Sequence, residues 1–218
     1  FRPDYPTIVY TQILKSIFPD VPVVLGGIEA SMRRLTHYDY WEDSLRPSFL
    51  VTSGADMLIY GMGEQPVREL MRLLGRGIPF TSLVTIPQTS VVLDRNVPLP
   101  VNKKWKDITL NSYEQCVKDQ KIFASNFLTF EKESNKIDAA RLIEPCREKN
   151  VIINPPFSPL ITAEADRLYD LPFMYLPHPK YNNKGPIPAY EMIKFSVNIH
   201  RGCFGGCSFC AIAAHQGK

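Results

Sequence analysis

Residues 56–74 read DMLIYGMGEQPVRELMRLL. Residues 57–60 form a short continuous apolar run that ends at Gly61 and Gly63, which predicts a strand buried on both faces. Pro66 suits the first turn of a following helix. The apolar stripe of that helix is Val67, Leu70, Met71 and Leu74. The stretch therefore predicts a strand, a glycine turn and a helix, the unit from which α/β sheets are built.

The rest of the first hundred residues alternates in the same way. The apolar residues of Thr7 to Phe18 recur with helical spacing. Helical spacing also covers residues 29–35, and strand signals fall at 22–25, 82–86 and 90–93. This alternation predicts βαβ units and a Rossmann-like, doubly wound α/β domain over residues 1–104. We expect further strands of that sheet to lie upstream of Phe1.

The middle of the chain, residues 105–190, is predicted to be a helical and proline-rich connector. Ser112 and Gln115 have capping-box spacing, so a helix is expected from Tyr113 to about Phe130. Further elements are expected as a helix around 139–143, a strand at 151–153 and a helix after Thr162. Nine of the nineteen prolines lie between Pro145 and Pro188, which favours an extended, semi-rigid segment there.

Composition excludes the disordered, collagen-like and coiled-coil classes of protein. The chain has 218 residues, is 44% hydrophobic and carries a formal net charge of +3, which is typical of a globular protein and gives no strong nucleic-acid signal. The basic run around Trp105, Lys103 to Lys106, is expected on a solvated loop. No apolar run is long enough to span a bilayer, and the sequence shows no signal-peptide pattern. We therefore expect a cytoplasmic protein with no membrane partner.

The cysteines carry most of the functional information. Three of the five, Cys203, Cys207 and Cys210, fall within eight residues in a C-x3-C-x2-C pattern. Their thiolates can converge on one metal centre if the loop bends sharply, and Gly205 and Gly206 give the backbone that freedom. Thiolate ligands select zinc or iron–sulfur clusters. In a [4Fe–4S] cluster, three cysteines would leave one iron without a protein ligand, open for chemistry.

The pattern with an aromatic residue, Phe209, before the last cysteine resembles that of the radical S-adenosylmethionine (radical SAM) superfamily. The wider sequence looks like its YgiQ-type subfamily. The residues that carry this likeness are 201–210, His215-Gln216-Gly217, Gly26-Gly27-Ile28-Glu29-Ala30-Ser31, Gly61-Met62-Gly63-Glu64 and Asn154-Pro155-Pro156. The resemblance covers nearly the whole chain and is weakest between Trp105 and Asn150.

This resemblance implies an enzyme with two cofactors, a [4Fe–4S] cluster and S-adenosylmethionine (SAM). Cys203, Cys207 and Cys210 would hold three irons, and SAM would bind the fourth and be cleaved reductively to a 5′-deoxyadenosyl radical. Phe209 would lie near the adenine. A reductase or flavodoxin-like electron donor is the expected partner, while the substrate is unknown. Residues 191–218, with a strand at Phe195 to Ile199, would begin a truncated radical SAM (β/α) barrel, so this piece alone is expected to be inactive.

Two other readings of the cysteines stay open. One is a structural zinc site in which His200 or His215 completes a Cys₃His tetrahedron. The other is a simple electron-carrying iron–sulfur module, although no fourth cysteine has ferredoxin spacing. The remaining cysteines and histidines are expected to have structural roles: Cys116, Cys146, His37 and His178.

The glycines of the first domain also allow two interpretations. The stretch from Gly61 to Pro66 follows a strand and opens a helix, but it lacks a third glycine, and Glu64 would repel a phosphate. A plain βα turn is the simpler reading. The resemblance also permits a cobalamin-binding layout, with cobalamin as a further cofactor. A nearby group of aromatic and basic residues is expected either to line a cleft or to pack between domains: Arg33, Arg34, Tyr38, Tyr40 and Trp41.

Overall fold

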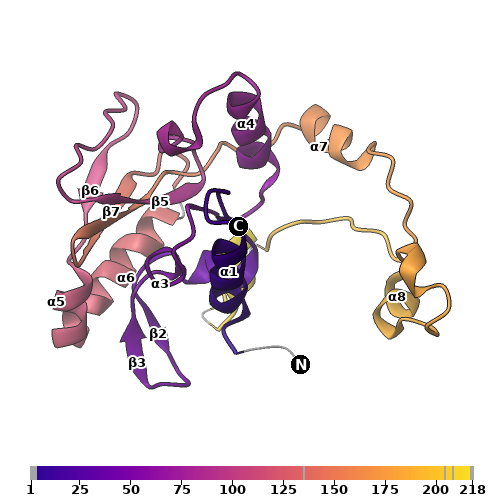
Figure 1. The fold of residues 1–218 in the computed structure, drawn as a ribbon, viewed down its shortest axis with the longest axis horizontal. Helices are drawn as coiled ribbons and strands as arrows, with labels where there is room; N and C mark the ends of the chain where they lie inside the picture. Colours follow the sequence, from indigo (N-terminus) through magenta and orange to yellow (C-terminus); the bar gives the residue numbers. More distant parts are fainter. Residues whose placement is uncertain (1–3, 135, 204, 208, 217–218) are drawn as a thin grey trace. The chain divides into compact units, whose positions relative to one another are not determined.

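The computed structural model describes residues 4–134, 136–203, 205–207 and 209–216. The chain divides into two compact units, one made of Phe1–Phe157 with Gly202–Lys218 and the other of Ser158–Arg201. The first unit contains a six-stranded sheet with helices around it (Figure 1). Its helices are α1 (Pro6–Ile17), α2 (Gly27–Met32), α3 (Phe49–Ser53), α4 (Glu64–Leu74), the short 3₁₀ helix η1 (Phe80–Ser82), α5 (Tyr113–Lys118), α6 (Gln120–Ser134) and α9 (Ala211–Gln216).

The sheet has the strand order β1-β4-β5-β8-β7-β6. Its strands are β1 (Val24–Leu25), β4 (Met57–Ile59), β5 (Thr89–Asp94), β6 (Asp107–Thr109), β7 (Arg141–Cys146) and β8 (Lys149–Ile153). The pairs β1–β4 and β6–β7 are parallel, whereas β4–β5, β5–β8 and β8–β7 are antiparallel. The α/β class is therefore confirmed. The sheet is mixed, however, and the predicted doubly wound, Rossmann-like or cobalamin-binding layout is not confirmed.

The route of the chain between β4 and β5 explains the antiparallel pairing. Helix α4 carries the chain away from the end of β4, and residues 75–88 then return it to that same end. Ile59 is consequently the sheet partner of Thr89, and the Tyr60 amide donates to the Gln88 carbonyl at 3.3 Å. Residues 82–86, which were expected to form a strand, belong to this return path and are not in a strand.

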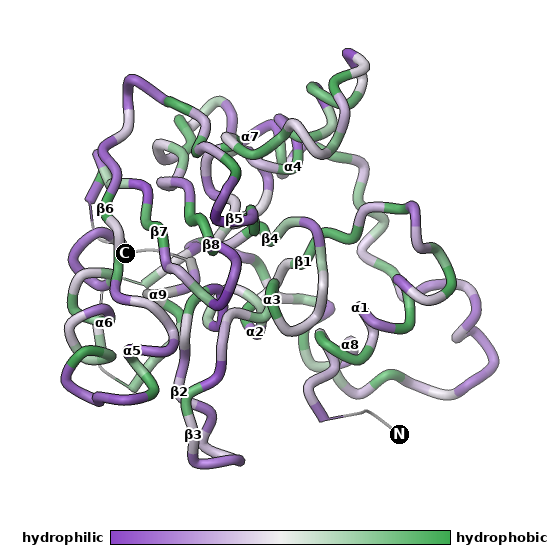
Figure 2. Tube along the Cα trace, turned by 60° about the vertical axis from the view of Figure 1, so that its left-hand side comes forward, coloured by the Kyte–Doolittle hydropathy of each residue, from purple (hydrophilic) through white to green (hydrophobic). Residues whose placement is uncertain are grey.

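Successive residues of the central strands face opposite layers of helices. Met57, Val91 and Ile152 pack with Leu70 of α4 on one face. On the other face, Leu58 packs with Ala30 of α2 and Leu50 of α3. Val151 and Ile153 contact the α5 and α6 residues Tyr113 and Phe130. Burial on both faces explains the apolar runs within these strands, Met57–Ile59, Val91–Leu93 and Val151–Ile153. Figure 2 shows green and purple stretches alternating along the traces of β5 and β8.

Residues 105–153 belong to this sheet and not to a separate connector, because β6, β7 and β8 extend it. The predicted boundary after residue 104 therefore falls inside one compact unit. The prediction of a helix around residues 139–143 is wrong, because this segment leads into β7, which begins at Arg141. Pairing with two neighbouring strands stabilises the extended conformation here, since Leu142 pairs with Ile108 of β6 and with Ile153 of β8.

The predicted capping box is confirmed. The Ser112 hydroxyl accepts the Gln115 amide, and the Gln115 side chain accepts the Ser112 amide at 2.8 Å. The helix that begins there is shorter than predicted, because Asp119 has extended backbone angles and separates α5 from α6. Figure 1 shows the two helices on one side of the sheet.

Two features of the N-terminal region were not predicted. A two-stranded hairpin, β2 (His37–Asp39) and β3 (Ser44–Arg46), follows α2. Helix α1 forms where its periodicity predicts, but its apolar stripe is exposed, with only Thr11 buried. The exposed residues are Tyr10, Ile13, Leu14, Ile17 and Phe18.

The second unit is proline-rich and largely without regular structure. Its elements are α7 (Thr162–Tyr169), η2 (Pro179–Tyr181) and α8 (Pro188–Ile193). Residues Phe195 to Ile199 form no strand. Phe195, Val197 and Ile199 alternate as a strand would, yet all three are more than 80% exposed. A strand needs a hydrogen-bonded neighbour, and none pairs with these residues in the described chain.

Candidate metal centre

The three-cysteine loop lies between Gly202 and α9. All three thiols are free; Cys207 is exposed, while Cys203 and Cys210 are partly buried. The Gly205 amide lies 3.4 Å from the Cys203 sulfur, and the Cys210 amide donates to the Cys207 carbonyl at 3.0 Å. The loop therefore bends back on itself between the first and last cysteine.

Gly205 marks the point where two of the thiols approach each other. A Cβ atom placed on this glycine would lie 3.4 Å from the Cys203 sulfur and 3.7 Å from the Cys207 sulfur. Both sulfurs thus face the same small space, which a larger residue would begin to fill. Within the described chain, no set of three or more Cys, His, Asp or Glu side chains is arranged to hold a metal ion. The donor chemistry fits a thiolate-ligated metal, and the described thiols do not yet converge on one point.

Helix α9, which follows Cys210 directly, packs against α2. It also approaches the turn after β4: a Cβ atom at Gly61 would lie only 3.1 Å from the His215 carbonyl oxygen. Gly61 has φ +68°, a left-handed conformation that glycine adopts without strain. The helix after the cysteines therefore rests on the stretches Gly26–Ser31 and Gly61–Glu64, both of which were singled out in the sequence.

A buried network of hydrogen bonds holds the turn at Gly61. The Gln88 side chain donates to the Tyr60 carbonyl at 2.8 Å, and the Tyr60 hydroxyl donates to the Asn154 carbonyl at 2.6 Å. The Gln88 backbone amide donates to the Pro155 carbonyl at 2.8 Å. The Asn154 amide nitrogen in turn donates to the carbonyls of Val84 and Ile86, each at 3.0 Å. The Asn-Pro-Pro stretch is therefore part of the same structure as the glycine turn.

A buried arginine stands next to this network. The Arg34 side chain lies between the rings of Tyr60 and Phe130, with its guanidinium carbon 4.5 Å from each ring centre. One of its nitrogens donates to the Ser31 carbonyl. Burial lowers the pKa of Arg34 to about 10, so the side chain stays charged at neutral pH. Desolvation, and then the Arg34 charge, lower the pKa of His215.

The other predicted site residues have mixed outcomes. Phe209 is 90% exposed and contacts no core. Cys116 and Cys146 are buried as expected, and desolvation raises the pKa of each thiol to about 11. Tyr38, Tyr40 and Trp41 are exposed on the β2–β3 hairpin, whereas Arg34 is in the core. The buried network of Gln88, Asn154 and Arg34 was not foreseen, and only the quoted glycine and proline stretches pointed toward it.

The arrangement defines a class of protein: an α/β domain whose glycine turns support the helix that follows a three-cysteine loop. Residues 1–196 match the family described as Radical SAM N-terminal, and the chain belongs to that family. The matched range ends before the cysteines, so the loop itself lies outside it. Among the described residues, no helix has the length and apolar character needed to cross a bilayer.

Relatives of the whole chain carry the name UPF0313 protein. The chain is 54% identical to one from Porphyromonas gingivalis, 48% to one from Geobacter sulfurreducens and 38% to UPF0313 protein YgiQ from Shigella flexneri. Each alignment covers 100% of this chain but only 34–36% of the relative. The chain therefore spans about a third of the length of these relatives. No solved structure matches it.

Proposed function

We propose that the protein containing this chain is a radical SAM enzyme whose N-terminal unit positions the cluster loop. The packing of α9 on α2, with the close approach of Gly61 to His215, is the observation that carries this proposal. These contacts join the cysteine segment to the part of the chain that matches the Radical SAM N-terminal family.

The roles of the loop residues follow from their chemistry. Cys203, Cys207 and Cys210 would bind three irons of a [4Fe–4S] cluster as thiolates. Once bound and reduced, the cluster supplies the electron that cleaves SAM to the 5′-deoxyadenosyl radical. Phe209 presents an exposed ring next to these ligands, which suits a contact with the adenine. The buried network around Gly61 would fix the position of α9, and with it Cys210, relative to the sheet.

Two other parts of the proposal rest on chemistry alone. Reductive cleavage needs an electron donor, and a reductase or flavodoxin-like protein would supply it. The substrate would contact the parts of the longer protein that this chain does not include. Neither cobalamin nor zinc is needed. The mixed sheet gives cobalamin no support, and the family match is to a radical SAM family and not to a zinc-binding one.

Anaerobic iron–sulfur reconstitution of the full-length protein tests the proposal. We expect a broad absorbance near 400 nm and about four irons per chain, together with dithionite-dependent release of 5′-deoxyadenosine from SAM. The variant Cys207→Ala should lose the cluster. Cys116→Ala is the matched control, because it removes a buried thiol outside the loop and should keep the cluster. Stoichiometric zinc without a chromophore, or full cluster occupancy in Cys207→Ala, would overturn the assignment.

A further inference from the structure

Helix α1 presents an apolar face that the described part of the chain leaves uncovered. Its apolar residues recur at the spacing of a core-facing helix, yet each is more than 40% exposed: Tyr10, Ile13, Leu14, Ile17 and Phe18. Folded proteins rarely leave a continuous apolar helix face in water, and such faces mark interaction sites. This face therefore indicates a contact with polypeptide outside the described residues.

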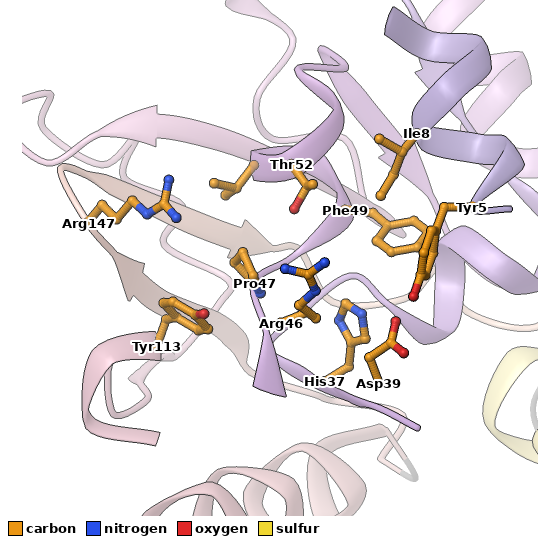
Figure 3. Close-up of a pocket in the computed structure, with 11 residues that line it drawn as sticks. Tyr5, Ile8, His37, Asp39, Arg46, Pro47, Phe49, Thr52, Tyr113 and Arg147 are labelled. Carbon is orange, nitrogen blue, oxygen red and sulfur yellow. The ribbon is translucent and has the colours of Figure 1, made fainter. Parts of the chain in front are cut away.

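The other side of α1 packs against α3. Ile8 of α1 and Phe49 of α3 line one pocket of about 280 Å³, which also reaches Arg147, a residue with a left-handed backbone at φ +53° (Figure 3). Helix α3 covers one face of the sheet, where Leu50 packs with Leu58 of β4. Helix α1 therefore lies on the same face of the sheet as α3.

Polar contacts at its two ends fix the direction of α1. Near its start, the Thr7 hydroxyl donates to Glu29, which follows the carboxyl end of β1. Near its end, the Lys15 ammonium pairs with Asp56 at 2.5 Å, just before the amino end of β4. Since β1 and β4 are parallel, α1 runs antiparallel to both. This is the direction of the helix in a βαβ unit, in which a strand before the helix is parallel to the strand after it.

Strand β1, into which α1 leads, has a free edge. It is the outermost strand of the sheet, with β4 on its inner side. Val24 is the partner of Met57, and the Met57 amide lies 3.4 Å from the Val23 carbonyl. In a parallel pair the neighbours of Val24 make the bonds to β4, so the N–H and C=O groups of Val24 point to the free edge. Figure 2 shows α1 beyond β1, at this end of the sheet. Open edges of this kind are normally paired or covered.

The handedness of crossovers decides on which side of β1 a strand before α1 would lie. The chain passes from β1 to its parallel neighbour β4 through α2 and α3, which pack on one face of the sheet. Crossovers between parallel strands are right-handed in about 98% of cases. Right-handed crossovers on the same face all step across the sheet in the same direction. Because α1 lies on that face too, a strand before α1 belongs on the side of β1 away from β4, at the free edge.

We propose that polypeptide preceding Phe1 in the full-length protein adds a strand to the free edge of β1, parallel to it, and that the apolar face of α1 covers this strand. The strand then pairs with the free N–H and C=O groups of Val24. The chain covers only 34% of its relative from Porphyromonas gingivalis, so the longer protein has polypeptide for this role. A second copy of the chain fits less well, because β1 has two residues and a two-fold axis would pair it antiparallel. The proposal is independent of the cysteine loop, and it gives a place and a direction to the upstream strand that the sequence predicts.

Photo-cross-linking in the full-length protein tests which segment covers α1. The photoreactive residue p-benzoylphenylalanine replaces Tyr10, which lies in the middle of the exposed stripe and is 51% exposed. Irradiation followed by peptide mass spectrometry should give a cross-link within one chain, to a residue that precedes Phe1. The same probe at Ile137, an exposed residue next to β7 at the other end of the sheet, is the control and should not reach that segment. A cross-link from position 10 to a second copy or to polypeptide after Lys218, or no cross-link, would overturn the proposal.

A pair of charge variants of the full-length protein tests whether the face is buried. Ile13→Glu places a carboxylate between α1 and the added strand, so it should lower the midpoint of thermal unfolding by about 5 °C or more. Ile137→Glu makes the same change on a side chain that is 84% exposed and lies outside this face. It should shift the midpoint by less than about 2 °C. Equal midpoints in the two variants would mean that the α1 face stays in water, and would overturn the proposal.

Discussion

The Glu144 carboxylate accepts the backbone amide of Thr36 at 2.9 Å, although the two residues are 108 positions apart. Glu144 lies on β7 and is 1% exposed. This single hydrogen bond fixes the segment after α2, which leads into the β2–β3 hairpin, onto the central sheet. Desolvation raises the pKa of Glu144 to about 7, because one amide does not replace the water that a carboxylate loses.

Glu144→Gln should make the protein more stable above neutral pH. The folded state holds the Glu144 proton up to about pH 7, while the unfolded chain releases it near the ordinary glutamate pKa of 4.5. The stability that comes from the protonated form is thus fully present below about pH 4.5 and is lost as the pH rises through 7. Glutamine keeps the acceptor for Thr36 without the charge. The gain at pH 8 should be on the order of 2–3 kcal/mol.

Urea unfolding at several values between pH 5 and 8 measures this effect. Glu148→Gln, on the exposed turn between β7 and β8, is the control and should follow the parent curve. Identical pH dependence of Glu144→Gln and the parent protein would show that Glu144 is ionised throughout.

Asn154→Asp should destabilise the fold strongly. The Asn154 amide nitrogen donates to two carbonyls and to the Thr89 hydroxyl, and the residue is fully buried. Aspartate has no donor and would place a charge against the two carbonyl oxygens. We expect a loss of about 3–5 kcal/mol in the free energy of unfolding. Asn102→Asp, whose carboxylate can still accept the Lys104 amide, should change it by less than about 0.5 kcal/mol.

A pair of glycine variants separates backbone strain from the contact with α9. Gly54 and Gly61 both have positive φ, at +74° and +68°. A Cβ at Gly54 meets nothing within 4 Å, whereas one at Gly61 meets the His215 carbonyl oxygen at 3.1 Å and the Gln88 side chain at 3.3 Å. Each change to alanine should cost about 1–2 kcal/mol from strain. Only Gly61→Ala should also lower iron retention after reconstitution, measured by iron analysis. Equal iron content in the two variants would mean that α9 does not need this contact.

The five cysteines should divide into two groups in an alkylation experiment on the protein without metal. Cys203, Cys207 and Cys210 are partly or fully exposed and should react with iodoacetamide at pH 8. Cys116 and Cys146 should not react until urea unfolds the chain, because they are buried and burial raises the pKa of each thiol. Peptide mass spectrometry distinguishes the sites. Protection of the three loop thiols after reconstitution would identify them as ligands, and their continued alkylation would argue against it.

Local sequence signals predicted the elements that depend on local interactions. The strand and helix of residues 56–74, the capping box at Ser112 and the helix α1 were all predicted, although the exposure of the α1 stripe was not. Strand β7 was not, because its conformation depends on its partners β6 and β8. The antiparallel direction of β5 was also hidden, since the return path of residues 75–88 has no strong signal of its own.

The candidate site was predictable only in part. The spacing of Cys203, Cys207 and Cys210 indicates a metal centre, and this stays a prediction, because no set of metal-binding side chains is arranged around one point in the described residues. The support of α9 by Gly61, and the burial of Arg34 between Tyr60 and Phe130, join segments that are far apart in the chain. Periodicity carries no information on such contacts. His37 was expected to be structural, and its hydrogen bond to Leu35 agrees.

The left-handed backbone of Arg147 has an evolutionary consequence. Glycine or asparagine would fit this turn without strain, whereas arginine costs about 1 kcal/mol there. Random substitution should therefore replace the arginine wherever its guanidinium has no task.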